Sequence, residues 1–94
     1  MRHLKNISVA KWEAFLELVG CHCNTSKTGH HEKWSRPDLN RPVIFQKTID
    51  PIPEFIIKNN LRVLGYSKDD FFDILEFKKE VVRNNNAFEI RPIR

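Results

Sequence analysis

Apolar residues recur at helical spacing in the first 20 positions. They fall on one face of a helix, whereas Lys11, Glu13 and Glu17 fall on the other. The apolar positions are Val9, Trp12, Phe15, Leu16 and Val19. Ser8 stands where a hydroxyl can cap the first turn, and Gly20 stands where a helix commonly ends. The pattern predicts a first helix over residues 9–19.

From Cys21 to Lys47 the helical spacing disappears, and short runs of Thr, Val, Ile, Trp and Phe alternate with turn residues. This pattern is typical of strands joined by turns. We predict three strands, joined by a hairpin at 27–30 and a longer turn at 37–41. The strands are Cys21–Ser26, His31–Arg36 and Pro42–Lys47. Their order predicts an antiparallel meander.

The middle strand places alternate side chains on opposite faces of the sheet. His31, Lys33 and Ser35 fall on one face, and Glu32, Trp34 and Arg36 fall on the other. We expect Trp34 to pack against a helix, which leaves His31 and Lys33 on the open face.

Two more helices are predicted in the second half. Asp50 stands as a cap before Pro51 and opens a helix that ends at Gly65. Its broad apolar face contains Phe55, Ile56, Ile57, Leu61, Val63 and Leu64. Ser67 and Asp70 have the spacing of a capping box for a third helix. Its core-facing stripe is Phe71, Ile74, Leu75 and Val82, and residues 84–94 are expected to form a tail or short extension.

These elements define an α+β fold in the order α-β-β-β-α, with a three-stranded antiparallel sheet packed on helices and an extra C-terminal helix. The chain has 94 residues, of which 40% are hydrophobic. That length suffices for one core, so we expect a single domain over residues 1–83.

Charge is unevenly distributed along the chain, whose formal net charge is +4. Residues 1–47 hold 8 Lys and Arg against 4 Asp and Glu, whereas residues 48–94 hold 8 of each. The basic half, which also holds every histidine, favours a polyanionic partner such as nucleic acid or an anionic surface, although this net charge also suits ordinary solubility.

No stretch approaches the roughly 18 apolar residues of a membrane span, and the N-terminus lacks the apolar core of a secretion signal. We expect a cytoplasmic protein without membrane association. Cys21 and Cys23 are too close together to staple a fold, so we expect reduced thiols.

Residues 27–36 bring an imidazole, cations and an aromatic side chain together. Because histidine ionises near neutral pH, His31 on the open face could act as general base or acid in phosphodiester cleavage. RNA carries its own nucleophile, the 2′-hydroxyl, so such an enzyme needs no metal. The cations that would contact phosphates are Lys27, Lys33, Arg36 and Lys47. The alternative is that His31 is an ordinary surface histidine.

A zinc site is the other chemistry that these residues suggest. Cys21, His22 and Cys23 could meet His30 and His31 on a neighbouring strand. However, the C-x-C spacing does not match the C-x(2–4)-C spacing usual in structural zinc sites. The glycines are isolated, so the chain contains no phosphate-binding loop or dinucleotide fingerprint. We therefore expect no metal and no cofactor.

The order of these motifs resembles the HicA family, small toxins that cleave messenger RNA in bacterial type II toxin-antitoxin pairs. Members combine a helix ending in glycine, a strand, a second strand opening with G-[small]-H-x-x-[aromatic], a third strand, and a helix closing with a Gly-x-Ser-like turn. The corresponding segments here are 12–20, Gly29-His30-His31-Glu32-Lys33-Trp34, 42–45 and 61–71. The resemblance covers about residues 8–75.

The resemblance implies a fold similar to a double-stranded RNA-binding domain and metal-independent cleavage of messenger RNA on the exposed sheet face. The family's catalytic histidine, three residues before the aromatic, falls on His31. His30 stands where the family often has a small residue. The implied partner, besides RNA, is a HicB-type antitoxin protein that covers His31. The helix from Ser67 and the residues beyond Asn84 exceed the minimal family length.

Two other functions remain open from the residues alone. A non-catalytic RNA-binding module would use the same face of the sheet. A protein-interaction domain would instead use the surface of the last helix.

Overall fold

The structure, a computed structural model, describes residues 2–24 and 31–93. Its helices are α1 (Val9–Leu18), α2 (Glu54–Leu64) and α3 (Lys68–Leu75). Its strands are β1 (His22–Cys23), β2 (His31–Ser35), β3 (Val43–Gln46), β4 (Lys79–Asn84) and β5 (Ala87–Pro92). The α+β class and the α-β-β-β-α order of the first five elements are as predicted.

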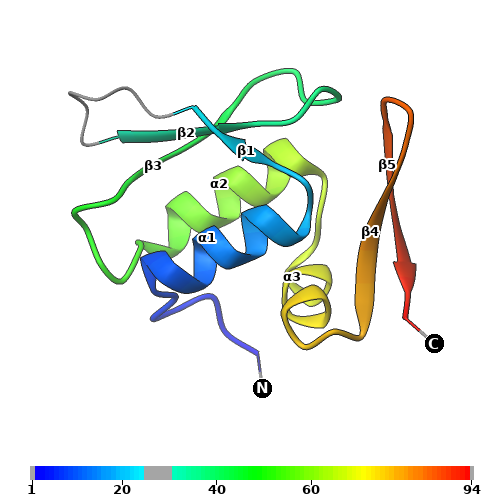
Figure 1. Cartoon of the computed structure of the whole chain (residues 1–94). Helices are drawn as coiled ribbons and strands as arrows, with labels where there is room; N and C mark the ends of the chain where they lie inside the picture. The colour runs from blue at the N-terminus through cyan, green and yellow to red at the C-terminus, as the bar shows by residue number, and fades with distance from the viewer. Residues whose placement is uncertain (1, 25–30, 94) are drawn as a thin grey trace.

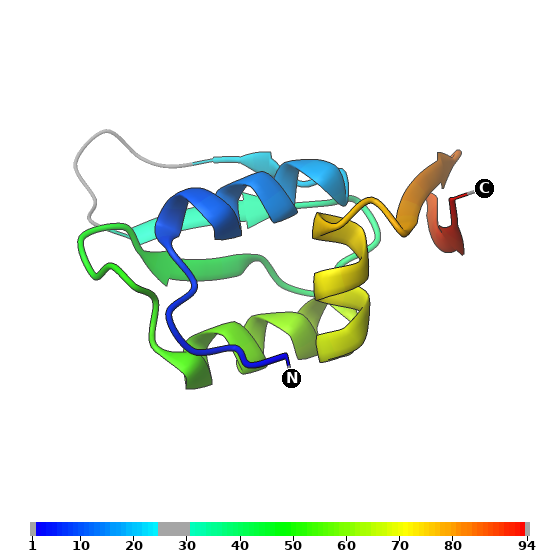
Figure 2. The same ribbon diagram turned by 90° about the horizontal axis from the view of Figure 1, so that it is seen from below.

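The first three strands form an antiparallel sheet with β2 in the centre. Trp34 of β2 lies opposite Val43 of β3, and Glu32 lies opposite Phe45. These four side chains are buried on the inner face of the sheet. Both α1 and α2 cover this face (Figure 1), and α3 crosses their ends (Figure 2). Along β2, exposed side chains of the outer face alternate with these buried ones, as predicted. The same alternation is present in β3.

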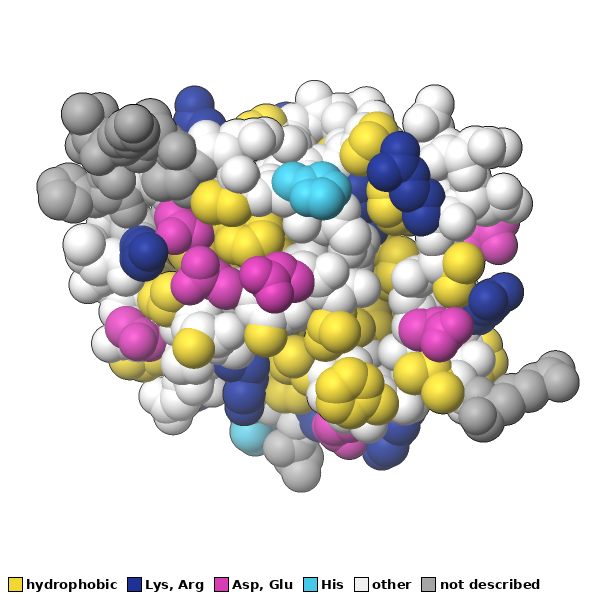
Figure 3. Space-filling model, viewed as in Figure 1, with side chains coloured by type: hydrophobic (Ala, Val, Ile, Leu, Met, Phe, Trp, Pro, Cys, Tyr) yellow, Lys and Arg dark blue, Asp and Glu magenta, His cyan; other side chains and the backbone are white. Residues whose placement is uncertain are grey.

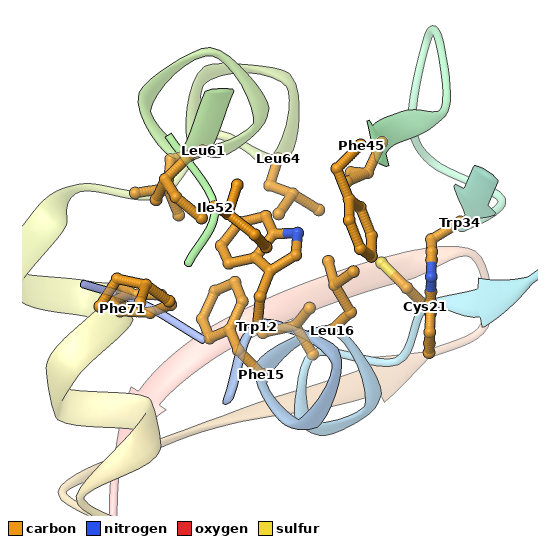
Figure 4. Close-up of a cluster of buried hydrophobic side chains, with 14 of the residues drawn as sticks. Trp12, Phe15, Leu16, Cys21, Trp34, Phe45, Ile52, Leu61, Leu64 and Phe71 are labelled. Atoms are coloured by element: carbon orange, nitrogen blue, oxygen red, sulfur yellow. The ribbon is translucent and has the colours of Figure 1, made fainter. Parts of the chain in front are cut away.

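Aromatic side chains fill the centre of the core (Figure 4). Trp12 and Phe15 of α1 stack with ring centroids 5.2 Å apart, and the Phe71 ring of α3 lies 4.7 Å from that of Phe15. Trp34 and Phe45 belong to the same cluster on the side of the sheet. Removing such large rings from water is a main driving force of folding. The helices and the sheet therefore share one core.

Three predicted helix ends are confirmed. The Ser8 Oγ accepts a hydrogen bond of 3.0 Å from the backbone N–H of Lys11. Ser67 and Asp70 make the two reciprocal hydrogen bonds of a capping box. Gly65 follows α2 with a φ of 82°, a left-handed conformation that glycine adopts without steric cost.

The residue predicted to cap the second helix, Asp50, instead serves the first helix. α2 begins at Glu54, and its N-cap residue, Pro53, makes no side-chain hydrogen bond. The Asp50 Oδ1 accepts a hydrogen bond of 3.1 Å from the backbone N–H of Val9, in the first turn of α1. A β-bridge between the segments that precede α1 and α2 brings the carboxylate within reach. The predicted role of Asp50 was therefore wrong, because tertiary pairing placed a different helix end beside it.

A buried side chain of α2 closes the outer edge of β3. The Asn60 amide donates to the Ile44 carbonyl at 2.9 Å and accepts from the Ile44 N–H at 3.4 Å. It thus supplies the two hydrogen bonds that a neighbouring strand would supply there. The Gln46 carbonyl accepts from the Ile49 N–H at 3.4 Å. Because unpaired strand edges attract other chains, these contacts protect the edge.

The last segment of the chain differs from the prediction. α3 ends at Leu75 and does not extend to Val82, and β4 and β5 pair as a hairpin where we expected helix and then a tail. Phe77 has a φ of 59°, which interrupts the helix. Asn85 has a φ of 61° in the turn between the strands, a conformation that asparagine tolerates better than most residues. The run of asparagines therefore makes a turn.

A buried arginine docks this hairpin on the rest of the domain. The Arg36 guanidinium donates to both carboxylate oxygens of Asp38, at 2.6 and 2.9 Å. Its Nη1 donates to the Val19 carbonyl and the Tyr66 hydroxyl, each at 2.8 Å. Its Cζ lies 4.4 Å from the ring centroid of Phe88 in β5, which is a cation–π contact. Arg36, with its side chain 2% exposed, thus joins segments from four parts of the chain.

The substitution Arg36→Lys is expected to lower the free energy of unfolding by about 2 kcal/mol or more, because a lysine cannot replace the planar fork and leaves buried acceptors unpaired. Urea unfolding followed by tryptophan fluorescence measures the change. Arg83→Lys is the matched control, since exposed Arg83 also stacks on Phe88, at 5.4 Å. Equal losses in the two variants would contradict the anchoring role of Arg36.

Candidate functional site

Polar side chains from β2 and β3 share the outer face of the sheet. The register places His31 opposite Gln46 and Lys33 opposite Ile44, and all four residues are exposed. Directly opposite residues in an antiparallel pair lie on the same face. The predicted acid/base residue, His31, and the predicted phosphate contact, Lys33, therefore lie on one open surface.

A glutamine orients the imidazole of His31. The Nε2 atoms of His31 and Gln46 lie 3.0 Å apart. With the amide nitrogen donating, the ring nitrogen is an acceptor, and the ring proton is assigned to Nδ1. A half-turn of the amide presents its oxygen to a protonated Nε2 instead. Gln46 can therefore be a hydrogen-bond partner of either protonation state, which suits a residue that takes and returns a proton.

A hollow of about 280 Å³ lies beside His31, between β3 and the start of α2. Its rim includes His31 and Gln46, and its apolar lining includes Ile44, Ile49, Phe55 and Ile56. Sequence reasoning assigned Phe55 to the apolar face of a helix, yet this side chain is 63% exposed. Gln46 was also missed, because its role depends on the register of β3 against β2. The alternation of buried and exposed positions in β3 was the signal that could have placed it on the outer face.

The predicted phosphate contacts do not all gather at this site. Lys33 lies on the outer face, whereas the Lys47 Nζ lies 3.4 Å from Oε1 of Glu32, a residue of the inner face. Arg36 is buried, and its guanidinium is directed at groups of the protein. It is therefore a structural residue and not an exposed phosphate contact. The alternation in β2, which put Arg36 on the face of Trp34, already indicated this. Lys27 and the neighbouring His30 lie outside the described residues.

Two carboxylates meet on the inner side of the sheet, and no sequence pattern had linked them. The Oε2 of buried Glu32 accepts a hydrogen bond of 2.8 Å from the Trp34 Nε1. Glu13 of α1 lies beside Glu32. Partial burial, followed by the charge of Glu32 and a hydrogen bond to it, raises the pKa of Glu13 above its ordinary value. Glu13 therefore holds its proton more tightly in the folded state than in the unfolded state.

The cysteines have different surroundings. Cys21 is buried, and burial raises the pKa of its thiol to about 11. Because metals bind the thiolate, Cys21 is a poor ligand near neutral pH. Cys23 is exposed, and its Sγ lies 3.9 Å from the Glu32 Oε2. Within residues 2–24 and 31–93, no three His, Cys, Asp or Glu side chains are grouped so that they could hold a metal ion.

Acidic side chains lie over α1, on a face that also carries Lys and Arg side chains. Figure 3 shows Asp and Glu side chains gathered over this helix, which contains Glu13 and Glu17. Such charges repel phosphate groups. The outer face of the sheet, with His31 and Lys33, is therefore the better surface for a polyanion.

Comparisons with known proteins identify no relative. No protein-family model matches the chain, and neither the curated proteins nor the solved structures yielded a match. In the part of the chain that the structure describes, no helix has the length and apolar character needed to span a membrane.

The substitution Glu13→Gln is expected to raise the melting temperature at pH 7. The raised pKa of Glu13 means that the folded state binds its proton more tightly, so this group makes stability fall as pH rises from the ordinary value of 4.5 through the raised value. At pH 7 the raised pKa of Glu13 lowers the stability of the folded state, whereas well below pH 4.5 the carboxyl is neutral in both states and has no such effect. Calorimetry of both proteins at pH 3 and pH 7 measures the difference.

Glu17→Gln, on the same helix, is the control for a general loss of negative charge. A difference in melting temperature that is the same at both pH values, or that Glu17→Gln reproduces, would contradict the assignment to the Glu13–Glu32 contact.

Proposed function

We propose that this protein is a metal-independent endoribonuclease that cleaves RNA on the outer face of its three-stranded sheet. The observation that carries the proposal is the exposed His31, held by Gln46 and accompanied by Lys33 on the same face. A histidine can supply the general base or acid of such a cleavage, and a cation beside it can bind the phosphate.

The reaction uses the ribose as nucleophile. With the Gln46 oxygen accepting from a protonated Nε2, the free Nδ1 of His31 takes the proton of a 2′-hydroxyl. That oxygen attacks the adjacent phosphorus while the bond to the 5′ oxygen of the next nucleotide breaks. The leaving oxygen takes a proton from the imidazolium or from water. The products are a 2′,3′-cyclic phosphate and a 5′-hydroxyl. Lys33 offsets the negative charge that builds up on the phosphate.

The resemblance to HicA toxins supplies the biological setting of the proposal. The observed order of helix, three antiparallel strands and helix is that of the family fold, which is similar to a double-stranded RNA-binding domain. The protein would then be the toxin of a type II pair, acting on messenger RNA in the cytoplasm. Its partner would be a HicB-type antitoxin that covers His31.

The purified protein is expected to cleave RNA in the presence of EDTA and to leave 2′,3′-cyclic phosphate ends. His31→Ala should reduce the rate by about 10²- to 10⁴-fold, the usual contribution of general acid–base catalysis. Gel analysis of end-labelled RNA measures the rate. His22→Ala is the matched control, because His22 pairs with Ser35 and so lies on the same face, away from Gln46.

Cleavage that persists in His31→Ala would overturn the catalytic assignment. Salt-dependent retention of RNA without products would instead identify a non-catalytic RNA-binding module that uses the same face.

Lys33→Ala is expected to weaken RNA binding and to reduce the slope of log affinity against log salt by about one, because one phosphate contact is lost. Fluorescence anisotropy over a salt series measures the slope. Lys68→Ala, at the start of α3, is the control for an exposed lysine far along the chain from the sheet. An unchanged slope in Lys33→Ala would remove Lys33 from the phosphate contacts.

A further inference from the structure

The hollow beside His31 exposes apolar groups that a folded protein usually buries. Three of the six large hydrophobic side chains that are exposed in the described residues line it, namely Ile44, Ile49 and Phe55. Grouped apolar exposure of this kind marks binding sites, whereas single exposed apolar residues need no explanation. The lining therefore indicates a ligand with an apolar surface.

Polar groups stand at the rim of this apolar lining. The Gln46 side chain carries a hydrogen-bond donor and an acceptor in one plane, and the His31 ring lies next to it at 3.0 Å. Lys33 is paired with Ile44, so a cation lies on the same face immediately beside the hollow. A ligand that suits this arrangement has a flat apolar ring, polar atoms along the edge of the ring, and a negative charge nearby.

We propose that the hollow binds one unpaired nucleobase of a single-stranded RNA. Its ring stacks on Phe55, its edge bonds to the Gln46 amide, and its phosphate lies towards Lys33. Stacking on aromatic side chains is the usual way in which proteins hold unpaired bases. This inference rests on the proposed function, because a base held in the hollow leaves its own ribose and phosphate beside His31.

The geometry also specifies the substrate class. Inside a duplex, the neighbouring base pairs cover both faces of a base, so its ring cannot reach Phe55 without leaving the stack. Unstacking and unpairing a base cost free energy, and that cost is least when the base is already single-stranded. The site therefore selects single-stranded over double-stranded RNA, although the resemblance to HicA toxins implies a fold similar to a double-stranded RNA-binding domain.

The test uses an RNA single strand whose 2′-hydroxyls are replaced by 2′-O-methyl groups, so that it binds without being cleaved. Phe55→Ala should weaken its binding about tenfold, since a base stacked on an aromatic ring contributes about 1–3 kcal/mol. Phe55→Trp should restore the affinity. The matched control is Phe77→Ala, because Phe77 is exposed to 68% but does not line the hollow. Anisotropy of a labelled strand, with circular dichroism to verify folding, measures the effect.

The same variants are then tested with the corresponding 2′-O-methyl duplex, which should show no difference between wild type and Phe55→Ala. Equal affinity of wild type and Phe55→Ala for the single strand would overturn the base subsite and leave the hollow to an apolar side chain of a partner protein. A tenfold loss for the duplex as well would overturn the selection of single strands.

Failure of the base subsite and failure of the proposed function give different results. Cleavage of natural RNA by wild type with unchanged binding in Phe55→Ala would reject the subsite and retain the ribonuclease. Binding that depends on Phe55 without any cleavage would retain the subsite and reject the ribonuclease. Absence of RNA binding by the wild type would reject both.

Discussion

The domain is organised around one buried positive charge. A guanidinium taken out of water is costly unless it finds hydrogen-bond acceptors, and all three nitrogens of the Arg36 guanidinium donate to groups of the protein. One of them is the Val19 carbonyl, where the helix dipole of α1 also favours a cation. The approach is close enough that a Cβ added to Gly20 would lie 2.9 Å from the Phe88 ring. Arg36 and its partners therefore fix the end of α1, the end of β2 and the β4–β5 hairpin relative to one another.

Interactions between residues close in sequence were enough to predict several helix ends, but not the structure of the last segment of the chain. Ser8, Gly65 and the Ser67–Asp70 pair act through neighbours within a few residues, so their roles could be predicted from spacing. Asp50 does not cap α2 because its carboxylate oxygen accepts a hydrogen bond from Val9 of α1, 41 residues earlier in the chain. The hairpin was missed because Val82 continues the apolar spacing of the third helix. Its formation depends on the left-handed backbone of Phe77 and Asn85 and on contact with the distant Arg36.

In the candidate site, too, the sequence predicted the positions of some residues and not of others. Alternation along β2 was enough to place His31 and Lys33 outside and Trp34 inside. The partners of His31 depend on the register of β3 against β2 and on the position of α2, and the predicted meander fixed neither of these. Gln46 and Phe55 therefore emerge only from the folded chain. Because both are carried by regular elements, their geometry relative to His31 is supported by the same core that stabilises the domain.

The amide of Asn60 has a consequence for how an inhibitor could act. Many proteins associate by adding a strand to an open sheet edge, and the affinity then comes from main-chain hydrogen bonds. At Ile44 those hydrogen bonds are already made by Asn60, beside the proposed active face. A protein that covers the proposed catalytic residue His31 from this edge would therefore compete with RNA through its side chains, by filling the hollow or pairing with Lys33. Inhibition would then depend on the inhibitor's surface chemistry, and it could be weakened by changing one side chain without disturbing the sheet.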